Sequence, residues 1–245
     1  MNLILFEKDE IEKPLSLKDE RGFHIIKVLK KKEGECFDGG VVNGTAGACR
    51  INRIENGNIY YSFLPGQESK PVFPLLPVTL IIGFPRPIQL KRLLRDCVSL
   101  GAASINLTAT ALGEKSYLNS NLLKDDAIRK NLLEGAMQGR GTGIPSLEFF
   151  LSLKQCLDSV SGNFNDGGKI LLDISPGAEP LSSLDLRRLS PVCLAIGSER
   201  GWTEEERGLF REKGFISCSL GKRILRTETA VTASLALALG RMGLI

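Results

Sequence analysis

The sequence predicts an α/β protein whose C-terminal part has a mainly parallel sheet, preceded by a small β domain. Three observations support this. From Val78 onward, apolar runs of strand length alternate with segments whose apolar residues recur at helical spacing. Before residue 65 there are only short β-like runs, separated by turn signals. A proline-rich stretch, residues 65–77, lies between the two patterns.

The N-terminal part is expected to be a small β barrel or sandwich. Turn signals at Asn43-Gly44 and at residues 55–58 separate its predicted strands. These strands are expected at residues 2–6, 40–42, 47–54 and 59–63. We therefore assign residues 1–70 to a first domain, 71–77 to a proline-rich linker and 78–245 to a second domain.

The second domain is expected to alternate strands with helices, which is typical of βαβ units. Strands are expected at residues 78–84, 104–108, 147–151, 169–174, 192–196 and 215–220. Helices are expected at 88–100, 122–137, 153–160 and 227–242, with one more after residue 203. Thr203 is a predicted helix N-cap, because Glu206 stands at the capping-box position.

Composition argues against several classes of function. The net charge is +4, and residues 1–70 hold 11 basic and 11 acidic side chains, so the excess lies after residue 70. This mild basicity is compatible with RNA binding. No apolar run approaches the roughly 20 residues of a membrane span, and the N-terminus lacks a signal-peptide pattern. We therefore expect a cytoplasmic protein that does not enter a membrane.

Histidine and cysteine usage argues against metal and hydrolase sites. The six cysteines are widely spread without a C-x-x-C pair, and His24 is the only histidine. Structural zinc usually needs clustered ligands, so we expect no metal site. A Ser–His–Asp triad would have to recruit His24 from the first domain. The cysteines are expected to be reduced residues of the core.

Two strand–turn–helix segments near the C-terminus carry the strongest signal. The run Val192–Ile196 ends in Gly197-Ser198-Glu199-Arg200-Gly201, and the run Phe215–Leu220 ends in a turn that holds Gly221 and three cations. Ligands of open α/β sheets bind at the carboxyl ends of strands. Charge and glycine concentrated at two such ends predict a binding site there.

These segments resemble signature loops of the SPOUT class of RNA methyltransferases, and within it of the ribosomal small-subunit methyltransferase E family. Residues 220–230, Leu-Gly-Lys-Arg-Ile-Leu-Arg-Thr-Glu-Thr-Ala, are similar to that family's Leu-Gly-x-Arg-Ile-Leu-Arg-x-Glu-Thr-Ala loop. Residues 197–201 resemble its Gly-Pro-Glu-Gly-Gly loop, with Ser198 in place of proline and Arg200 in place of glycine. Residues 23–30 and 34–39 resemble its opening block.

The resemblance implies a PUA-like β barrel followed by an α/β domain with a deep trefoil knot. It also implies a homodimer with sites at the subunit interface. The implied activity is transfer of a methyl group from S-adenosylmethionine to N3 of a uridine in small-subunit (16S) ribosomal RNA. Two alternatives stay open: a SPOUT enzyme acting on a ribose 2′-hydroxyl or another base, and a non-catalytic RNA-binding assembly factor. The last alternative is favoured by the departures at Ser198 and Arg200 and by Met137, which stands where the family has the glutamate of a Glu-Gln-x-x-Arg pattern.

The resemblance also assigns roles to residues. The cofactor-binding candidates are Leu172, Asp173, Ile196, Gly197, Ser198, Glu199, Gly201, Leu220, Gly221, Ile224, Leu225 and Arg226. Arg226 is the catalytic candidate, because its guanidinium could orient the target base or stabilise developing charge; a structural pair with Glu228 is the simpler reading. Glu199 and Glu228 are candidates for the general base that removes the N3 proton of the uridine, and the choice between these and other groups stays open. Glu199 could instead cap a helix N-terminus.

The candidates for RNA contact are basic or polar side chains of both domains: Lys27, Lys30, Arg86, Lys91, Arg95, Gln138, Arg140 and Arg223. Lys91 and Arg95 are four residues apart and share a helix face, although a charged face is more often simply solvated. Gln138 and Arg140 resemble the family's Glu-Gln-x-x-Arg pattern before a Val-Pro, but Arg140 falls one position early.

Overall fold

The computed structural model describes residues 2–114, 116–117, 125–162, 164 and 167–245. It divides into two compact units. The first unit consists of residues 1–75 and 133–144, and the second of residues 76–132 and 145–245. The boundary at residue 75 falls inside the predicted linker. The contribution of residues 133–144 to the first unit was not predicted.

The segment 133–144 belongs to the first unit because its backbone forms hydrogen bonds with residues near the N-terminus and with the turn at Asn43. The Met137 carbonyl oxygen accepts from the amides of Asn2 and Leu3, at 3.0 and 3.1 Å. The Asn43 amide donates to the Thr142 carbonyl at 2.8 Å. Bonds between distant parts of the chain leave no periodic signal in the sequence, so this packing could not be foreseen.

The first unit contains a five-stranded sheet of order β1-β3-β4-β5-β2. β1 is parallel to β3, and the other neighbouring pairs are antiparallel. The strands are β1 (Ile4–Phe6), β2 (Leu15–Ser16), β3 (Cys36–Val41), β4 (Ala46–Glu55) and β5 (Asn58–Pro65). Their buried side chains include Phe6, Phe37, Cys49, Ile51 and Ile59. This apolar cluster is the core of the unit.

Two features of the first unit differ from the prediction. β3 begins at Cys36, four residues before the strand expected at 40–42. Its glycines, Gly39 and Gly40, hide the alternation of apolar and polar residues. A Cβ at Gly39 would lie 2.5 Å from Cys49 Sγ, so this close approach requires glycine. The short helices α1 (Glu20–Phe23) and η1 (His24–Val28, a π-helix) were missed, because nine residues carry too little periodicity.

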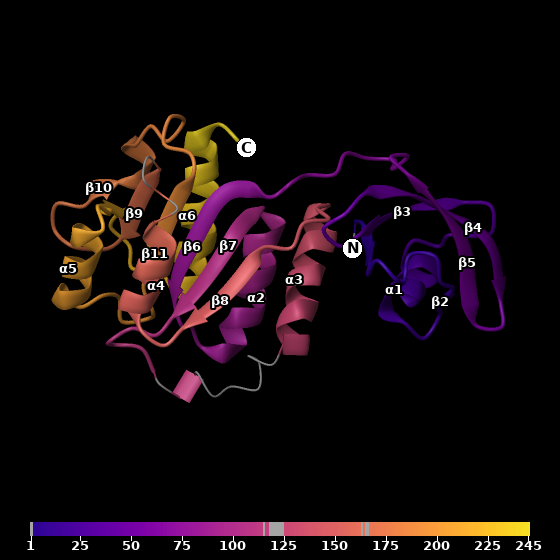
Figure 1. Cartoon of the computed structure of the whole chain (residues 1–245), viewed down its shortest axis with the longest axis horizontal. Helices are drawn as coiled ribbons and strands as arrows, with labels where there is room; N and C mark the ends of the chain where they lie inside the picture. The colour runs from indigo at the N-terminus through magenta and orange to yellow at the C-terminus, as the bar shows by residue number, and fades with distance from the viewer. Residues whose placement is uncertain (1, 115, 118–124, 163, 165–166) are drawn as a thin grey trace. The chain divides into compact units, whose positions relative to one another are not determined.

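The second unit contains a seven-stranded sheet of order β10-β12-β9-β11-β6-β7-β8, with all neighbouring pairs parallel. Figure 1 shows this sheet. The strands are β6 (Leu76–Gly83), β7 (Ala102–Thr108), β8 (Ser146–Phe150), β9 (Gly168–Leu172), β10 (Glu179–Pro180), β11 (Val192–Ile196) and β12 (Ile216–Ser219). Six of them match expected strands within a few residues, which confirms the mainly parallel α/β fold.

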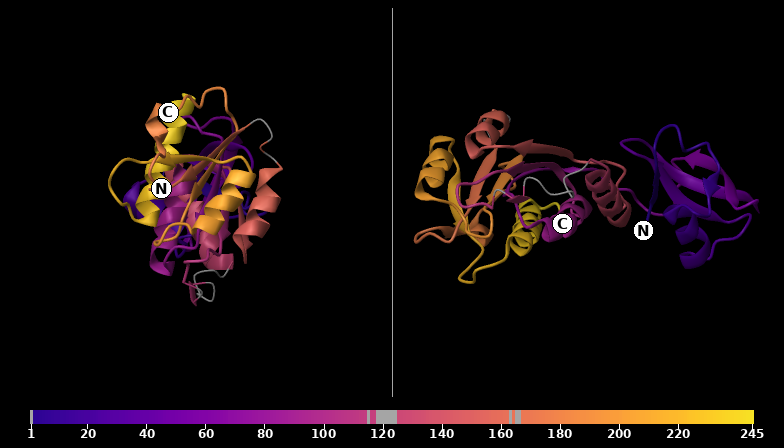
Figure 2. Two further views of the ribbon diagram at one scale, coloured as in Figure 1. Left: turned by 90° about the vertical axis from the view of Figure 1, so that its left-hand side faces the viewer. Right: turned by 90° about the horizontal axis from the view of Figure 1, so that it is seen from below.

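Helices cover both faces of this sheet (Figure 2). α2 (Pro87–Ser99) and α6 (Thr227–Met242) pack together on one face, while α4 (Leu153–Ser161) and α5 (Glu204–Glu212) cover the other. α3 spans Asp125–Gly139, and η4 (Leu181–Ser183) is a 3-10 turn. The expected helix start at Leu122 lies outside the described residues. All other expected helices are confirmed within a few residues.

Alternation along the strands sends side chains to both helical layers. Ile81, Leu171 and Ala195 belong to the buried cluster formed with α4 and α5. The intervening Leu80 and Leu194 are fully buried and point to the opposite face. Strands buried on both faces read as continuous apolar runs, which is why the sequence revealed them clearly.

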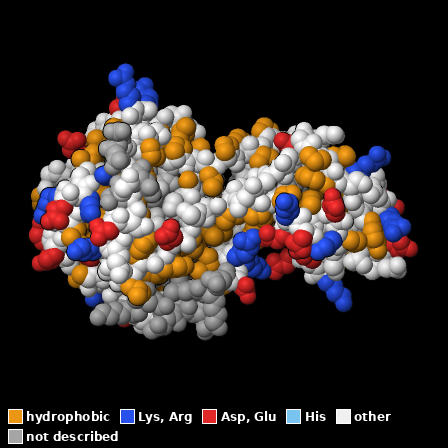
Figure 3. Space-filling model, viewed as in Figure 1, with side chains coloured by type: hydrophobic (Ala, Val, Ile, Leu, Met, Phe, Trp, Pro, Cys, Tyr) orange, Lys and Arg blue, Asp and Glu red, His pale blue; other side chains and the backbone are white. Residues whose placement is uncertain are grey.

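The small net charge is reflected in a surface of mixed charge, and most of the cysteines are buried. On the face shown in Figure 3, Lys and Arg are interspersed with Asp and Glu rather than gathered in one patch. All six cysteines are free; five are buried in the core as expected, whereas Cys36, at the start of β3, is exposed, so that expectation is wrong for this residue. Burial raises the pKa of the Cys218 thiol to about 11, so it stays protonated near neutral pH. Within the described residues, no helix is both long and apolar enough to cross a membrane.

Candidate functional site

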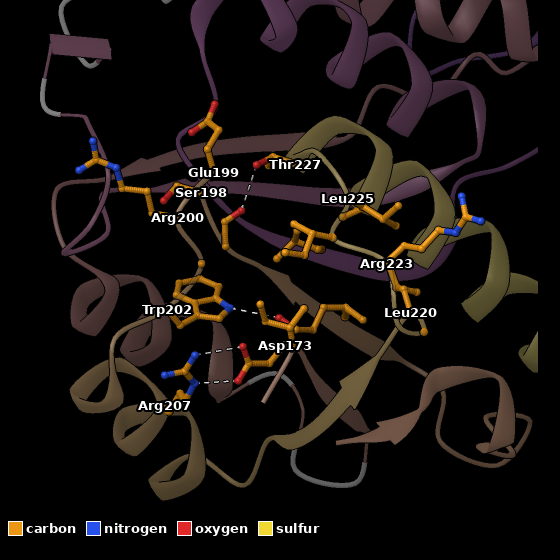
Figure 4. Close-up of a pocket in the computed structure, with 18 residues that line it drawn as sticks. Asp173, Ser198, Glu199, Arg200, Trp202, Arg207, Leu220, Arg223, Leu225 and Thr227 are labelled. Carbon is orange, nitrogen blue, oxygen red and sulfur yellow. Dashed lines mark hydrogen bonds and ion pairs between the residues drawn. The ribbon is translucent and has the colours of Figure 1, made fainter. Parts of the chain in front are cut away.

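A pocket of about 280 Å³ lies at the carboxyl ends of β9, β11 and β12. Figure 4 shows the residues that line it. They are Leu172, Asp173, Ile174, Ile196, Gly197, Ser198, Glu199, Arg200, Gly201, Trp202, Arg207, Leu220, Gly221, Arg223, Ile224, Leu225, Thr227 and Ala230. The two segments singled out in the sequence thus face one cavity.

The lining contains every predicted cofactor residue except Arg226. It also contains residues outside that set of cofactor candidates: Ile174, Arg200, Trp202, Arg207, Arg223, Thr227 and Ala230. Thr227 and Ala230 belong to the second motif and could have been included. Trp202 and Arg207 carried no such signal, because the start of α5 brings them to the pocket only in the folded chain.

The first wall is the glycine turn, residues 197–201. The Gly201 amide donates to the Ser198 carbonyl at 2.9 Å, and Gly201 has a φ of +69°. A Cβ at Gly197 would lie 2.9 Å from Gly201 Cα, and one at Gly83 on β6 would lie 2.4 Å from the Ser198 amide nitrogen. Gly197 and Gly83 are therefore needed for this close backbone packing, and Gly201 is favoured by its positive φ.

The second wall is the C-terminal loop, residues 220–226. Among the described residues, no backbone N–H from Gly221 to Arg226 donates to another backbone group. Gly221 has a φ of +102°, and Ile224 is 83% exposed. The Thr227 hydroxyl of α6 donates to the Gly197 carbonyl at 3.4 Å and connects the loop to the glycine turn. The loop therefore offers free donors and an apolar side chain to a ligand.

A buried ion pair forms the base of the pocket. Arg207 Nε and Nη2 donate to the two carboxylate oxygens of Asp173, at 2.7 and 3.2 Å. The Asp173 side chain is only 3% exposed. Burial alone raises the pKa of Asp173, but the hydrogen bonds from Arg207 and Ser175 outweigh it and hold that pKa below its usual value. Asp173 is therefore ionised and occupied by Arg207.

Glu199 faces away from the base of the pocket. Its carboxylate points away from Trp202 and Asp173 in Figure 4, and Oε1 accepts from the Arg86 amide at 3.0 Å. The predicted N-cap of α5 is confirmed at Thr203, which forms a capping box with Glu206. Glu199 thus does not cap α5. Its carboxylate instead accepts a hydrogen bond from Arg86, the residue that precedes α2.

Arg226 is the N-cap residue of α6, exposed and outside the pocket lining. Among the described residues its side chain has no ion pair, so the simpler reading of an Arg226–Glu228 pair is wrong. Glu228 is half-buried in the first turn of α6. The guanidinium is therefore free to contact a substrate.

The predicted RNA-contact residues occupy both units. In the first unit Lys27, Lys30 and Gln138 are exposed. In the second unit Arg86, Lys91 and Arg95 are exposed at the start and along α2, and Arg223 lines the pocket. The described residues contain no group of three His, Cys, Asp or Glu that could hold a metal ion.

Arg140 has a structural position instead. Its guanidinium pairs with Asp38 at 2.8 Å and donates to the carbonyl oxygens of Asn2, Lys70 and Pro71. The two side chains of the ion pair are only 12% and 9% exposed. A guanidinium with four acceptors inside the first unit is not available to a phosphate, so we remove Arg140 from the RNA contacts.

Comparison with known proteins decides the family. The model of an RNA methyltransferase domain matches residues 72–239. The "Ribosomal RNA small subunit methyltransferase E" of Treponema pallidum is 41% identical over 98% of this chain and 91% of that protein. The chain belongs to the ribosomal RNA small subunit methyltransferase E family. The resemblance inferred from the sequence is thereby confirmed.

Other members of the methyltransferase E family are similar to this chain over nearly its whole length. The "Ribosomal RNA small subunit methyltransferase E 1" of Borreliella burgdorferi is 32% identical and covers 96% of this chain and 95% of its own. A crystal structure of the Neisseria gonorrhoeae enzyme, bound to S-adenosyl methionine, has a TM-score of 0.78 at 22% identity and covers 98% of this chain and 97% of its own. That likeness shows the same fold.

Proposed function

We propose that this chain transfers the methyl group of S-adenosylmethionine to N3 of a uridine in small-subunit (16S) ribosomal RNA. Membership of the methyltransferase E family carries the proposal, since relatives that match nearly the whole chain are named ribosomal RNA small subunit methyltransferases. The pocket between the glycine turn and the C-terminal loop supplies a place for the cofactor.

The residues present fit S-adenosylmethionine. Leu172, Ile196 and Leu225 offer apolar walls for an adenine ring, and the unpaired amides of the C-terminal loop offer donors. The cavity, about 280 Å³, is close to the lower end of the roughly 300–1,000 Å³ of ligand sites. We therefore assign the cofactor to the eleven predicted residues that line the pocket.

The bound cofactor supplies a sulfonium methyl that is already activated. The chain's own residues then have to align the nucleophile and remove water. Arg226 is free to hold the target base or to stabilise charge on its carbonyl oxygen. Glu228, half-buried in the next turn, is the candidate to receive the N3 proton.

Several structural and cellular features are part of the same proposal. We infer a PUA-like barrel in the first unit, supported by its five-stranded sheet. We infer a trefoil knot in the second unit, supported by the position of β12 between β9 and β10. We infer a homodimer in the cytoplasm, where ribosomal RNA is available.

RNA contact is proposed for exposed cations of each unit. In the first unit Lys27 and Lys30 accompany the apolar residues Phe23 and Val28, which are 56% and 58% exposed. Cations beside an exposed aromatic ring suit a single-stranded nucleic acid, which offers phosphates and bases for stacking. In the second unit Arg86, Lys91, Arg95 and Arg223 are the candidates. Gln138 remains a candidate as an exposed polar contact.

Mass-spectrometric mapping of methylated nucleotides tests the proposal. Small-subunit RNA from cells without this protein is compared with RNA from cells complemented by the wild type or by Arg226→Ala. A single N3-methyluridine present only with the wild type supports the proposal. A 2′-O-methyl or another methylated base would instead indicate a different SPOUT activity. No change in any nucleotide, together with RNA binding, would indicate an assembly factor.

A further inference from the structure

Three contacts join the wall of the pocket to the loops that follow β6 and β7. Glu199 Oε1 accepts from the Arg86 amide at 3.0 Å. The Ser198 and Thr110 hydroxyls lie 3.1 Å apart in a hydrogen bond. Glu206 Oε1 accepts from the Ala111 amide at 2.8 Å. The positions of the glycine turn and of the start of α5 are therefore held by hydrogen bonds to these two loops, in addition to their own backbone contacts.

The Glu199 contact is directed at a single available donor. Arg86 lies between Pro85 and Pro87, which have no N–H, so its amide is the one backbone donor of that tripeptide. Arg86 is also the N-cap residue of α2, where a carboxylate is favoured by the helix dipole. The Arg86 guanidinium is much less closely engaged: it is 61% exposed and 4.0 Å from the same oxygen.

We propose that Glu199 is a positioning residue that fixes the glycine turn against the Arg86 amide, and that it is not the base of the reaction. This proposal rests on the proposed function for the identity of the ligand. The Glu199 carboxylate is turned away from Asp173 and Trp202 (Figure 4), and its Oε1 is already engaged by the Arg86 N–H. Glu199 is one of the residues that line the pocket, so fixing its side chain against Arg86 holds that part of the wall.

Ser198 strengthens the same wall in this chain. It stands where the family pattern has proline, it is 6% exposed, and its hydroxyl reaches Thr110 on the loop after β7. A proline could not make that bond. The departure that the sequence presented as a possible loss of function thus adds a contact that holds the turn.

Calorimetric titration of the full-length protein with S-adenosylmethionine, without RNA, tests the proposal. Glu199→Gln keeps an oxygen acceptor for the Arg86 amide and should bind within about threefold of the wild type, whereas Glu199→Ala should bind about tenfold or more weakly. Methylation at a subsaturating cofactor concentration should follow the same order, and at saturating cofactor Glu199→Gln should be active with an unchanged pH profile. An inactive Glu199→Gln that binds normally would make Glu199 a base and overturn the proposal.

A matched pair at Arg86 tests the donor. Arg86→Pro removes the N–H at a residue whose φ of −53° proline accepts, and Arg86→Ala removes only the side chain. We expect Arg86→Pro to weaken cofactor binding as Glu199→Ala does, and Arg86→Ala to leave it unchanged. Equal affinities for Arg86→Pro and Arg86→Ala would overturn the proposal. A wild type that does not bind S-adenosylmethionine would instead refute the proposed function.

Discussion

Removal of Arg207 should destabilise the second unit far more than removal of a neighbouring arginine on the same helix. Arg207 is the partner of Asp173, whose carboxylate is 3% exposed at the base of the pocket. Arg207→Ala would leave that carboxylate buried without its cation. On α5, Arg211 makes a comparable 2.8 Å pair with Glu204, but those side chains are 61% and 69% exposed.

The expected magnitudes follow from this difference in exposure. Loss of one partner of a buried pair costs about 3–5 kcal/mol. Because Arg207 is itself 25% exposed, water screens part of the interaction, and we expect about 2–3 kcal/mol in the free energy of unfolding. For a unit of this size that lowers the Tm by about 4–12 °C. Arg211→Ala should cost less than about 1 kcal/mol.

The chain contains its own probe for this measurement. Trp202 is the only tryptophan, it is 3% exposed, and its Nε1 donates to the Leu172 carbonyl beside Asp173. Thermal and urea unfolding followed by its fluorescence therefore reports on the second unit. Equal Tm values for the Arg207→Ala and Arg211→Ala variants would refute the stabilising role of the buried pair.

Three further predictions concern both units. Arg226→Ala should abolish methylation with an unchanged Tm, since that side chain is exposed; methylation at the wild-type rate would exclude Arg226 from the mechanism. Gly221→Ala places a side chain at a φ of +102° and should weaken S-adenosylmethionine binding, while Gly57→Ala, also at a positive φ (+76°), should not; calorimetry compares them. Arg140→Ala should destabilise the first unit without changing cofactor affinity, as measured by urea unfolding and calorimetry. Burial raises the pKa of Asp38, but Ser69 and Arg140 lower it overall. The stability that Asp38 contributes is therefore present above about pH 4 and is lost as the pH falls through its folded-state pKa. A circular-dichroism titration of Arg140→Ala should show a weaker acid dependence than the wild type, and an identical dependence would contradict the assignment.

The sequence predicted the parts of the fold that produce a local pattern. Strands such as β6 and β11, buried on both faces, appear as uninterrupted apolar runs, and the glycines that follow β11 and β12 mark the turns. Those signals were sufficient to place both walls of the pocket. The base of the pocket was only half predicted: Asp173 ends an apolar run, but its partner Arg207 is one of many charged residues on α5.

The positions of other site residues could not be predicted, because they depend on contacts between segments far apart in the sequence. Arg140 was placed among RNA contacts because its neighbours match a family pattern, yet the fold surrounds it with Asp38 and three carbonyl oxygens. The orientation of Glu199 depends on Arg86, more than a hundred residues away. A carboxylate in a glycine turn has no sequence feature that distinguishes a base from a positioning contact.

The place of β12 in the sheet has a consequence for the order in which the pocket can be completed. Both of its neighbours, β9 and β10, precede it by at least 36 residues, so a nascent chain must leave room between them until residues 216–219 emerge. The C-terminal loop emerges later still. If the cofactor binds in this pocket as we propose, its capture requires a nearly finished polypeptide, and prematurely terminated products of translation do not hold the methyl donor.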